Sequence, residues 1–146
     1  MEKINKYQVA TELLDNAIRL YFEENSYFSA LHLAGGAEEV LAVYLDDLDV
    51  KSAFERTKSF FLWSYNADNS YQGKKSETEI VDYLNNPKNS VKHKRGKVDN
   101  HVEFDPAVET RKILDRAITN YCLLMPRLGL AETLQIIKYR AHRLEV

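Results

Sequence analysis

Hydrophobic positions recur every three or four residues along most of this chain, which is the period of an amphipathic helix. The pattern is clearest over residues 6–45, where a polar turn at residues 24–26 separates two apolar stripes. The first stripe contains Ala10, Leu13, Leu14, Ala17, Ile18 and Tyr21, and the second contains Ala30, Leu33, Ala34, Ala37, Leu41, Tyr44 and Leu45. The spacing predicts a helical hairpin with arms over residues 6–23 and 26–46.

The same period predicts further helices after residue 50. An aromatic-rich helix is expected over residues 50–65, followed by a loop over residues 66–75. Its aromatic residues are typical of a core or of a subunit interface. Ser76 and Glu79 have the spacing of a capping box, which predicts a short helix from residue 76 through Leu84. The sequence Asn85-Asn86-Pro87 should end that helix, because the residue before a proline disfavours helical angles.

Two more helices are expected in the last third of the chain. Asp105 and Pro106 suit the start of a long helix. Pro126 and Gly129 should interrupt it before a last helix over residues 130–144. The inward positions of these two helices are predicted to be Val108, Ile113, Leu114, Ala117, Ile118, Tyr121, Leu130, Leu134, Ile137 and Ala141.

No segment alternates between apolar and polar residues as a half-buried strand does. The sequence therefore predicts an all-α fold, an antiparallel bundle of five to six helices in a single domain over residues 1–146. Inside the second arm, Ala34-Gly35-Gly36-Ala37 forms a patch of small residues. Close approach of a neighbouring helix explains that patch, and a ligand contacting the exposed backbone is the alternative.

Composition limits the classes of function. The 146 residues are 45% hydrophobic and 29% charged with a net charge of −2, as expected for a globular protein rather than one that coats nucleic acid. The single cysteine, Cys122, excludes an internal disulfide and favours a buried, inert thiol. There is no signal-peptide pattern and no apolar run of about 20 residues, so we expect a cytoplasmic protein without membrane contact.

The acidic residues after the second arm could suggest a metal site. Asp46, Asp47 and Asp49 lie close together, but no matching ligand motif follows, and a solvated linker explains them better. The sequence contains no Ser/His/Asp arrangement, glycine-rich phosphate loop or metal signature. We therefore expect no metal and no cofactor. His32 lies between inward positions of the hairpin and should be a hydrogen-bonded histidine at the edge of the core.

The most distinctive polar stretch is residues 88–97. It carries five cations and no acid, with His93 among them; the cations are Lys88, Lys92, Lys94, Arg95 and Lys97. Such a cluster attracts phosphate. A neutral histidine beside it could accept a proton from a ribose 2′-hydroxyl while the cations hold the phosphate, which is the chemistry of metal-free RNA cleavage. The alternative is a solvated basic loop with an incidental histidine.

The hairpin pattern and this stretch resemble HEPN domains, small bacterial and eukaryotic helical bundles of which many are RNases. Their motif is arginine, a polar residue that is often asparagine, three residues and histidine. The segment from Lys88 through Asn89 to His93 matches that spacing, with lysine in place of the arginine. Lysine keeps the charge but lacks the planar bidentate fork. The chain also resembles a group of short uncharacterised bacterial helical proteins with an Asn-x-x-Lys-His segment.

The resemblance implies roles for these residues. Lys88 would contact the phosphate, Asn89 would position it, and His93 would act as base or acid. Lys92, Lys94, Arg95 and Lys97 would bind RNA or phosphate. Pairing of two HEPN copies around the site implies a homodimer, as does the aromatic third helix.

Three hypotheses follow from the sequence. The first is an RNA- or nucleotide-phosphate-binding protein, in its strongest form a degenerate metal-independent RNase. The second is a non-catalytic helical dimeric interaction module, such as an adaptor or a toxin–antitoxin-type partner that binds another protein. The third is an unrelated helical protein whose basic loop has no role.

Overall fold

The computed structural model describes residues 1–67 and 76–145. Within these ranges it contains helices and no strand, which confirms the all-α fold. The helices are α1 (Lys6–Glu23), α2 (Tyr27–Asp47), α3 (Ala53–Ala67), α4 (Glu77–Lys92), α5 (Pro106–Leu128) and α6 (Leu134–Leu144). None of them is long and apolar enough to cross a membrane.

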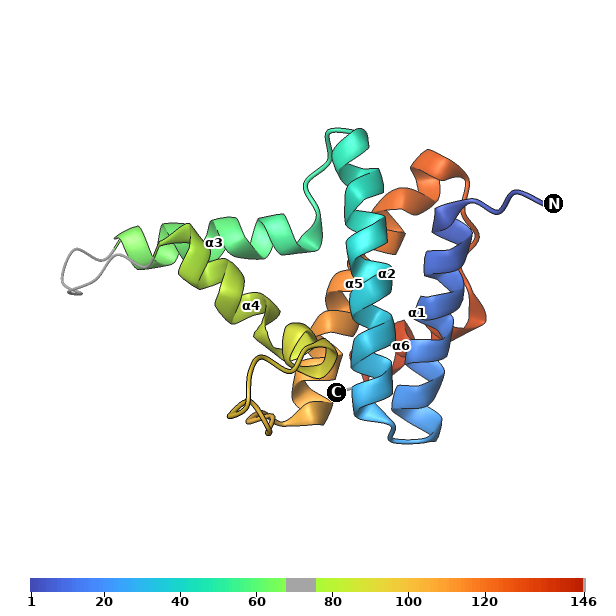
Figure 1. Cartoon of the computed structure of the whole chain (residues 1–146). Helices are drawn as coiled ribbons and strands as arrows, with labels where there is room; N and C mark the ends of the chain where they lie inside the picture. The colour runs from blue at the N-terminus through green and yellow to red at the C-terminus, as the bar shows by residue number, and fades with distance from the viewer. Residues whose placement is uncertain (68–75, 146) are drawn as a thin grey trace.

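Four helices, α1, α2, α5 and α6, form a bundle around one hydrophobic core (Figure 1). The expected apolar stripes of α1 and α2 supply much of it, with Ala10, Leu14, Ala17, Ile18, Ala34, Ala37, Leu41 and Leu45 buried. Leu31 of α2, which was not in the expected stripe, is buried in the core as well. Cys122 packs against this core half-buried, and burial raises the pKa of its thiol. The spacing rule identified these two helices because helical period depends only on local sequence.

The remaining helices, α3 and α4, form an arm that projects from the bundle (Figure 1). They lie beside each other, and the end of α4 returns to the bundle next to α2. Asn66 and Ala67 belong to α3 rather than to the expected loop, whose residues 68–75 lie outside the described part of the chain. Ser76 caps α4 as expected, because its hydroxyl accepts the Glu79 backbone N–H at 3.2 Å.

The expected end of α4 at residues 85–87 is wrong. The helix continues through Pro87 to Lys92. A proline inside a helix removes one backbone donor and usually kinks or ends the helix. Here Pro87 is buried, and Arg116 of α5 donates to the Leu84 carbonyl and to the Asn85 side chain at 3.1 and 3.0 Å. These contacts hold the turn around the proline against the bundle.

The last third of the chain also differs in detail from the prediction. Helix α5 runs through Pro126 and ends only at Leu128, where Gly129 adopts the left-handed angles of a C-cap (φ 65°). Val108, expected inside, is exposed. The buried residues of α6 are Ile136 and Tyr139, rather than Leu134, Ile137 and Ala141, which are all exposed.

A polar contact ties the start of α6 to α1. Thr133 caps the helix by accepting the Ile136 N–H at 3.2 Å, and its hydroxyl donates to the Asp15 carboxylate of α1 at 2.6 Å. The helix begins at Leu134, directly after this cap, and its inward residues are Ile136 and Tyr139. Burial raises the pKa of Asp15, and the hydrogen bond from Thr133 partly offsets that effect.

The small-residue patch of α2 lies between two helices, as expected for a close helix approach. A Cβ added to Gly36 would be 3.6 Å from Leu13 Cδ1 of α1. A Cβ added to Gly35 would be 3.5 Å from the Cβ and Cδ atoms of Lys88 in α4. Gly35 thus receives the aliphatic stem of a lysine whose ammonium group is the centre of the site described next.

Candidate functional site: a buried charge cluster and a cationic segment

The side chain of Glu38 lies on the inner face of α2 and is only 3% exposed. Two cations neutralise it. Its Oε2 accepts from Lys88 Nζ of α4 at 2.9 Å, and its Oε1 accepts from Arg116 of α5, with Nη2 at 2.7 Å and Nε at 3.2 Å. We call these three residues the charge cluster. A buried carboxylate needs such partners, since an isolated charge away from water is strongly unfavourable.

Arg116 is the most fully bonded member of the charge cluster. Besides Glu38, it donates to the Leu84 carbonyl and to Asn85 Oδ1, both on α4. Its guanidinium also lies 4.8 Å from the centre of the Phe54 ring of α3, a cation–π distance. One side chain of α5 therefore contacts three other helices.

A buried amide extends the network. Asn120 of α5 is fully buried, and its Oδ1 accepts the backbone N–H of Ala53 at the start of α3, at 2.8 Å. Its Nδ2 donates to the backbone carbonyl of Glu38 at 3.3 Å. Polar groups around Glu38 therefore help to attach the arm to the bundle.

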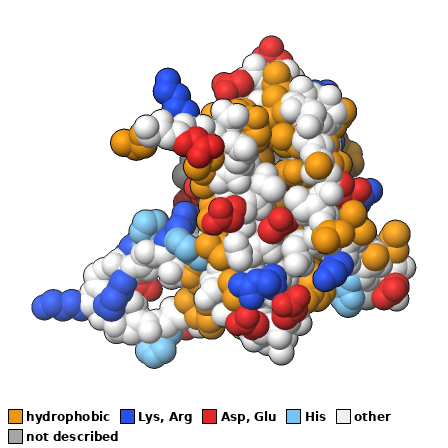
Figure 2. All heavy atoms as spheres, turned by 90° about the vertical axis from the view of Figure 1, so that its right-hand side faces the viewer, with side chains coloured by type: hydrophobic (Ala, Val, Ile, Leu, Met, Phe, Trp, Pro, Cys, Tyr) orange, Lys and Arg blue, Asp and Glu red, His pale blue; other side chains and the backbone are white. Residues whose placement is uncertain are grey.

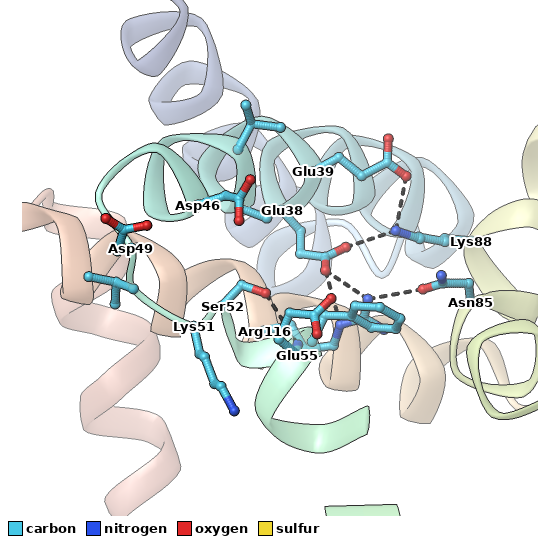
Figure 3. A pocket seen from close by; sticks show the side chains of 14 residues that line it. Glu38, Glu39, Asp46, Asp49, Lys51, Ser52, Glu55, Asn85, Lys88 and Arg116 are labelled. Atoms are coloured by element: carbon cyan, nitrogen blue, oxygen red, sulfur yellow. Dashed lines mark hydrogen bonds and ion pairs between the residues drawn. The ribbon is translucent and has the colours of Figure 1, made fainter. Parts of the chain in front are cut away.

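A cavity of about 660 Å³ opens beside the charge cluster, between α2, α4, α5 and the start of α3. In Figure 3 the ion pairs run from Lys88 through Glu38 to Arg116, while Asp46 and Asp49 lie toward the other end. Within the described residues, neither of these two aspartates forms an ion pair. The volume suits a small ligand, but every buried polar side-chain atom of the described residues has a partner within the chain.

Glu39 forms the rim of the cavity, next to the cationic residues of α4. Its Oε1 is 2.9 Å from Lys88 Nζ and 3.4 Å from Lys92 Nζ. Partial burial acts to raise the pKa of Glu39, but hydrogen bonds and charge from Lys88 and Lys92 outweigh it, and the pKa lies below its ordinary value. Lys88 and Lys92 are one helical turn apart, so both face α2.

Beyond α4 the chain forms a projecting turn, residues 93–101, which we call the cationic segment. His93, Lys94, Arg95, Lys97 and His101 are all exposed there. The turn is fixed by its own contacts: Asp99 Oδ2 accepts the Arg95 backbone N–H at 2.6 Å, and Gly96 has φ 81°. In the described part of the chain, no carboxylate forms an ion pair with the basic side chains of this segment.

The residues singled out from the sequence are thus divided between two environments. The structure brings Lys88 and Lys92 together on Glu39, with Lys88 buried in the charge cluster. Asn89 is half-buried one residue further along α4. His93 is exposed at the C-terminal cap, where its backbone N–H donates to the Asn89 carbonyl at 3.0 Å. Lys94, Arg95 and Lys97 are exposed beyond it.

Three polar members of the network were not recognised in the sequence. Glu38, Arg116 and Asn120 each lie within a helical apolar pattern, and Glu38 directly follows Ala37 of the α2 stripe. A charged or amide residue at an inward position signals a buried polar partner elsewhere in the chain. The prediction for His32 is wrong in the other direction: it was expected at the edge of the core, and it is exposed.

The face of the molecule that Figure 2 shows is mixed in charge. Figure 2 shows acidic, basic and hydrophobic side chains interspersed on one face of the molecule, without a broad basic field. No group of three or more histidine, cysteine or acidic residues in the described ranges is arranged to hold a metal ion.

None of the protein-family models, curated proteins and solved structures compared with the chain matches it. The resemblance to HEPN domains therefore stays a prediction from the hairpin pattern and from the motif between Lys88 and His93.

Proposed function

We propose that the protein binds single-stranded RNA, or another phosphate-bearing chain, through the cationic segment and does not cleave it. The observation that carries this proposal is the exposure of Lys94, Arg95 and Lys97 on one projecting turn without carboxylate partners among the described residues. Exposed cations on a fixed turn can contact phosphates without first breaking internal ion pairs. In this proposal the protein is a degenerate HEPN-like domain that has kept RNA binding and lost cleavage.

The position of Lys88 supports binding without catalysis. The sequence motif requires its cation to hold a phosphate next to His93. Its ammonium group instead lies between Glu38 and Glu39, both at 2.9 Å, with the side chain 6% exposed. Removing it from two carboxylates to meet a phosphate would leave buried Glu38 with only one of its cations, which is strongly unfavourable.

The test is fluorescence anisotropy with a labelled oligouridylate at low salt and in EDTA. The triple variant K94A/R95A/K97A should lose about tenfold or more in affinity, and the slope of log affinity against log salt should fall by about two. The matched control K3A/K6A/K138A removes the same charge from exposed positions outside the cationic segment and should bind nearly as wild type. Equal loss in both variants, or no binding by wild type, would exclude this function.

A second function is favoured by a different observation. On α3, Phe60 and Trp63 are 60% and 67% exposed, with ring centroids 6.1 Å apart. Large neighbouring aromatic side chains exposed on a projecting arm are typical of a protein-binding surface. We therefore also propose a non-catalytic interaction module that pairs two copies of the chain through this face of α3.

Light scattering at micromolar concentration tests that second proposal. Wild type should give a dimer mass and F60S/W63S a monomer mass, while L134S/I137S, which changes exposed apolar residues of α6, should remain dimeric. A monomeric wild type would rule out pairing through α3. Because RNA binding is measured on a different segment, either function can fail without the other.

A further inference from the structure

A second cavity, of about 770 Å³, lies between α5 and the arm. It is distinct from the cavity beside the charge cluster, although Arg116 lines both. Residues from α3, α4, α5 and the segment before α5 form its walls. Its volume is in the range of small-molecule sites, so its chemistry indicates what it would accept.

Aromatic rings line this cavity from three separate parts of the chain. They are Phe61 of α3, Tyr83 of α4 and Phe104 of the segment before α5. The ring centroids of Phe61 and Tyr83 are 6.3 Å apart. The ring of Phe104 packs edge to face against that of Phe28, with centroids 6.3 Å apart. Ring faces carry partial negative charge, so such walls accept both an aliphatic chain and a cationic group.

Among the described residues, the carboxylates that line this cavity outnumber the cations that line it. Of the four that line it, Glu109 pairs with Lys112 at 2.7 Å and Asp115 lies 3.2 Å from Arg143. The other two, Asp82 and Glu103, form no ion pair within the described residues. Arg116, the remaining cation at this cavity, is committed to Glu38 at 2.7 Å.

We propose that this cavity binds a primary ammonium or guanidinium group carried on an aliphatic chain. Asp82 and Glu103 would neutralise the cation, and the rings of Phe61, Tyr83 and Phe104 would contact the chain. A free linear diamine and a lysine or arginine side chain of a peptide share this chemistry. An anion is disfavoured, because these two carboxylates, which form no ion pair among the described residues, repel it. The inference is independent of RNA binding, which uses the cationic segment.

Calorimetric titration of the full chain tests the proposal, with 1,5-diaminopentane for the free diamine and N-acetyl-lysine amide and N-acetyl-arginine amide for the peptide side chains. At least one of them should bind saturably, and 1,5-pentanediol, the neutral analogue of the diamine, should not. Removing both charges in D82N/E103Q should weaken binding at least about tenfold. The control D46N/D49N removes the same charge at the other cavity and should bind as wild type.

A third variant examines the aromatic wall. F104L keeps an apolar side chain but removes the ring face, and it should weaken binding severalfold with a melting temperature close to that of wild type. The tighter of the diamine and amide probes identifies the source of the cation. Absence of saturable binding to all three cations, or unchanged affinity in D82N/E103Q, or equal loss in D46N/D49N, overturns the proposal.

Discussion

Glu38 and Lys88 are 50 positions apart in the chain, yet their side chains form a buried ion pair with Nζ 2.9 Å from Oε2. Glu38 belongs to α2 of the bundle and Lys88 to α4 of the arm. The lysine that the sequence motif places on a phosphate is therefore an anchor between two parts of the fold. This relationship determines what substitutions at both positions should do.

Replacing Glu38 with glutamine should destabilise the protein by about 3 kcal/mol. The substitution leaves Lys88 and Arg116 buried without their shared carboxylate, and breaking a buried pair from one side costs roughly 3–5 kcal/mol. Urea denaturation measures the change. Glu12→Gln is the control: Glu12 is exposed on α1 without an ion pair among the described residues, and its loss should change stability by less than about 0.5 kcal/mol. A loss below about 1 kcal/mol in E38Q would contradict the anchoring role.

Restoring the arginine of the HEPN motif should not create a nuclease. In Lys88→Arg the new guanidinium would replace the ammonium group between Glu38 and Glu39. It would then be hydrogen-bonded to these carboxylates and not to a phosphate. We expect no metal-independent cleavage of single-stranded RNA in EDTA by wild type, K88R or H93A. Cleavage that appears in K88R and disappears in K88R/H93A would instead establish a degenerate RNase site.

Gly36 should tolerate alanine but not leucine. An alanine Cβ would lie 3.6 Å from Leu13 Cδ1, an ordinary van der Waals distance, and alanine is better than glycine in a helix by up to about 1 kcal/mol. Leucine would have to displace α1 and should destabilise by about 1–3 kcal/mol. Thermal melts of G36A and G36L should therefore shift in opposite directions. A neutral G36L would mean that α1 and α2 are not closely packed at this point.

The pair of Glu39 with Lys88 and Lys92 should make stability depend on acid pH. Because the pKa of Glu39 is lower in the folded protein than its ordinary value of 4.5, its contribution is present above that value. It is lost as the pH falls through the lower, folded-state pKa. Urea midpoints of wild type should therefore drop more steeply than those of Glu39→Gln as the pH is lowered below about 4.5. Parallel pH profiles for the two proteins would show that the pair contributes nothing.

The local pattern of the chain predicted most of the helices because a helix buries one stripe of its own sequence. The bounds of α1 and the buried stripes of α1 and α2 follow from that period. Capping by Ser76 and Asp105 could also be predicted from the sequence, because each side chain accepts from the backbone N–H three residues further on. Such interactions span one turn and do not depend on the rest of the fold.

Tertiary packing decided the helix bounds and the inward faces at positions where local sequence patterns conflict with contacts to distant residues. Pro87 should have ended α4, but bonds from Arg116 to Leu84 and Asn85 support the helix there. The inward residues of α6 are Ile136 and Tyr139, and its cap Thr133 is bonded to Asp15, 118 positions away. The local sequence around Pro87 or Thr133 does not show which distant residue will contact it.

The role of Lys88 also depends on a residue that is distant in the sequence. Its sequence neighbours are cations and a histidine, so the sequence alone identified a phosphate-attracting stretch. The sequence does determine that residues 94–97 are strongly cationic. Only the tertiary structure places Glu38 within 2.9 Å of Lys88, because α2 and α4 meet there. An ammonium group takes its strongest interactions from the charges nearest in space, whatever their separation along the chain.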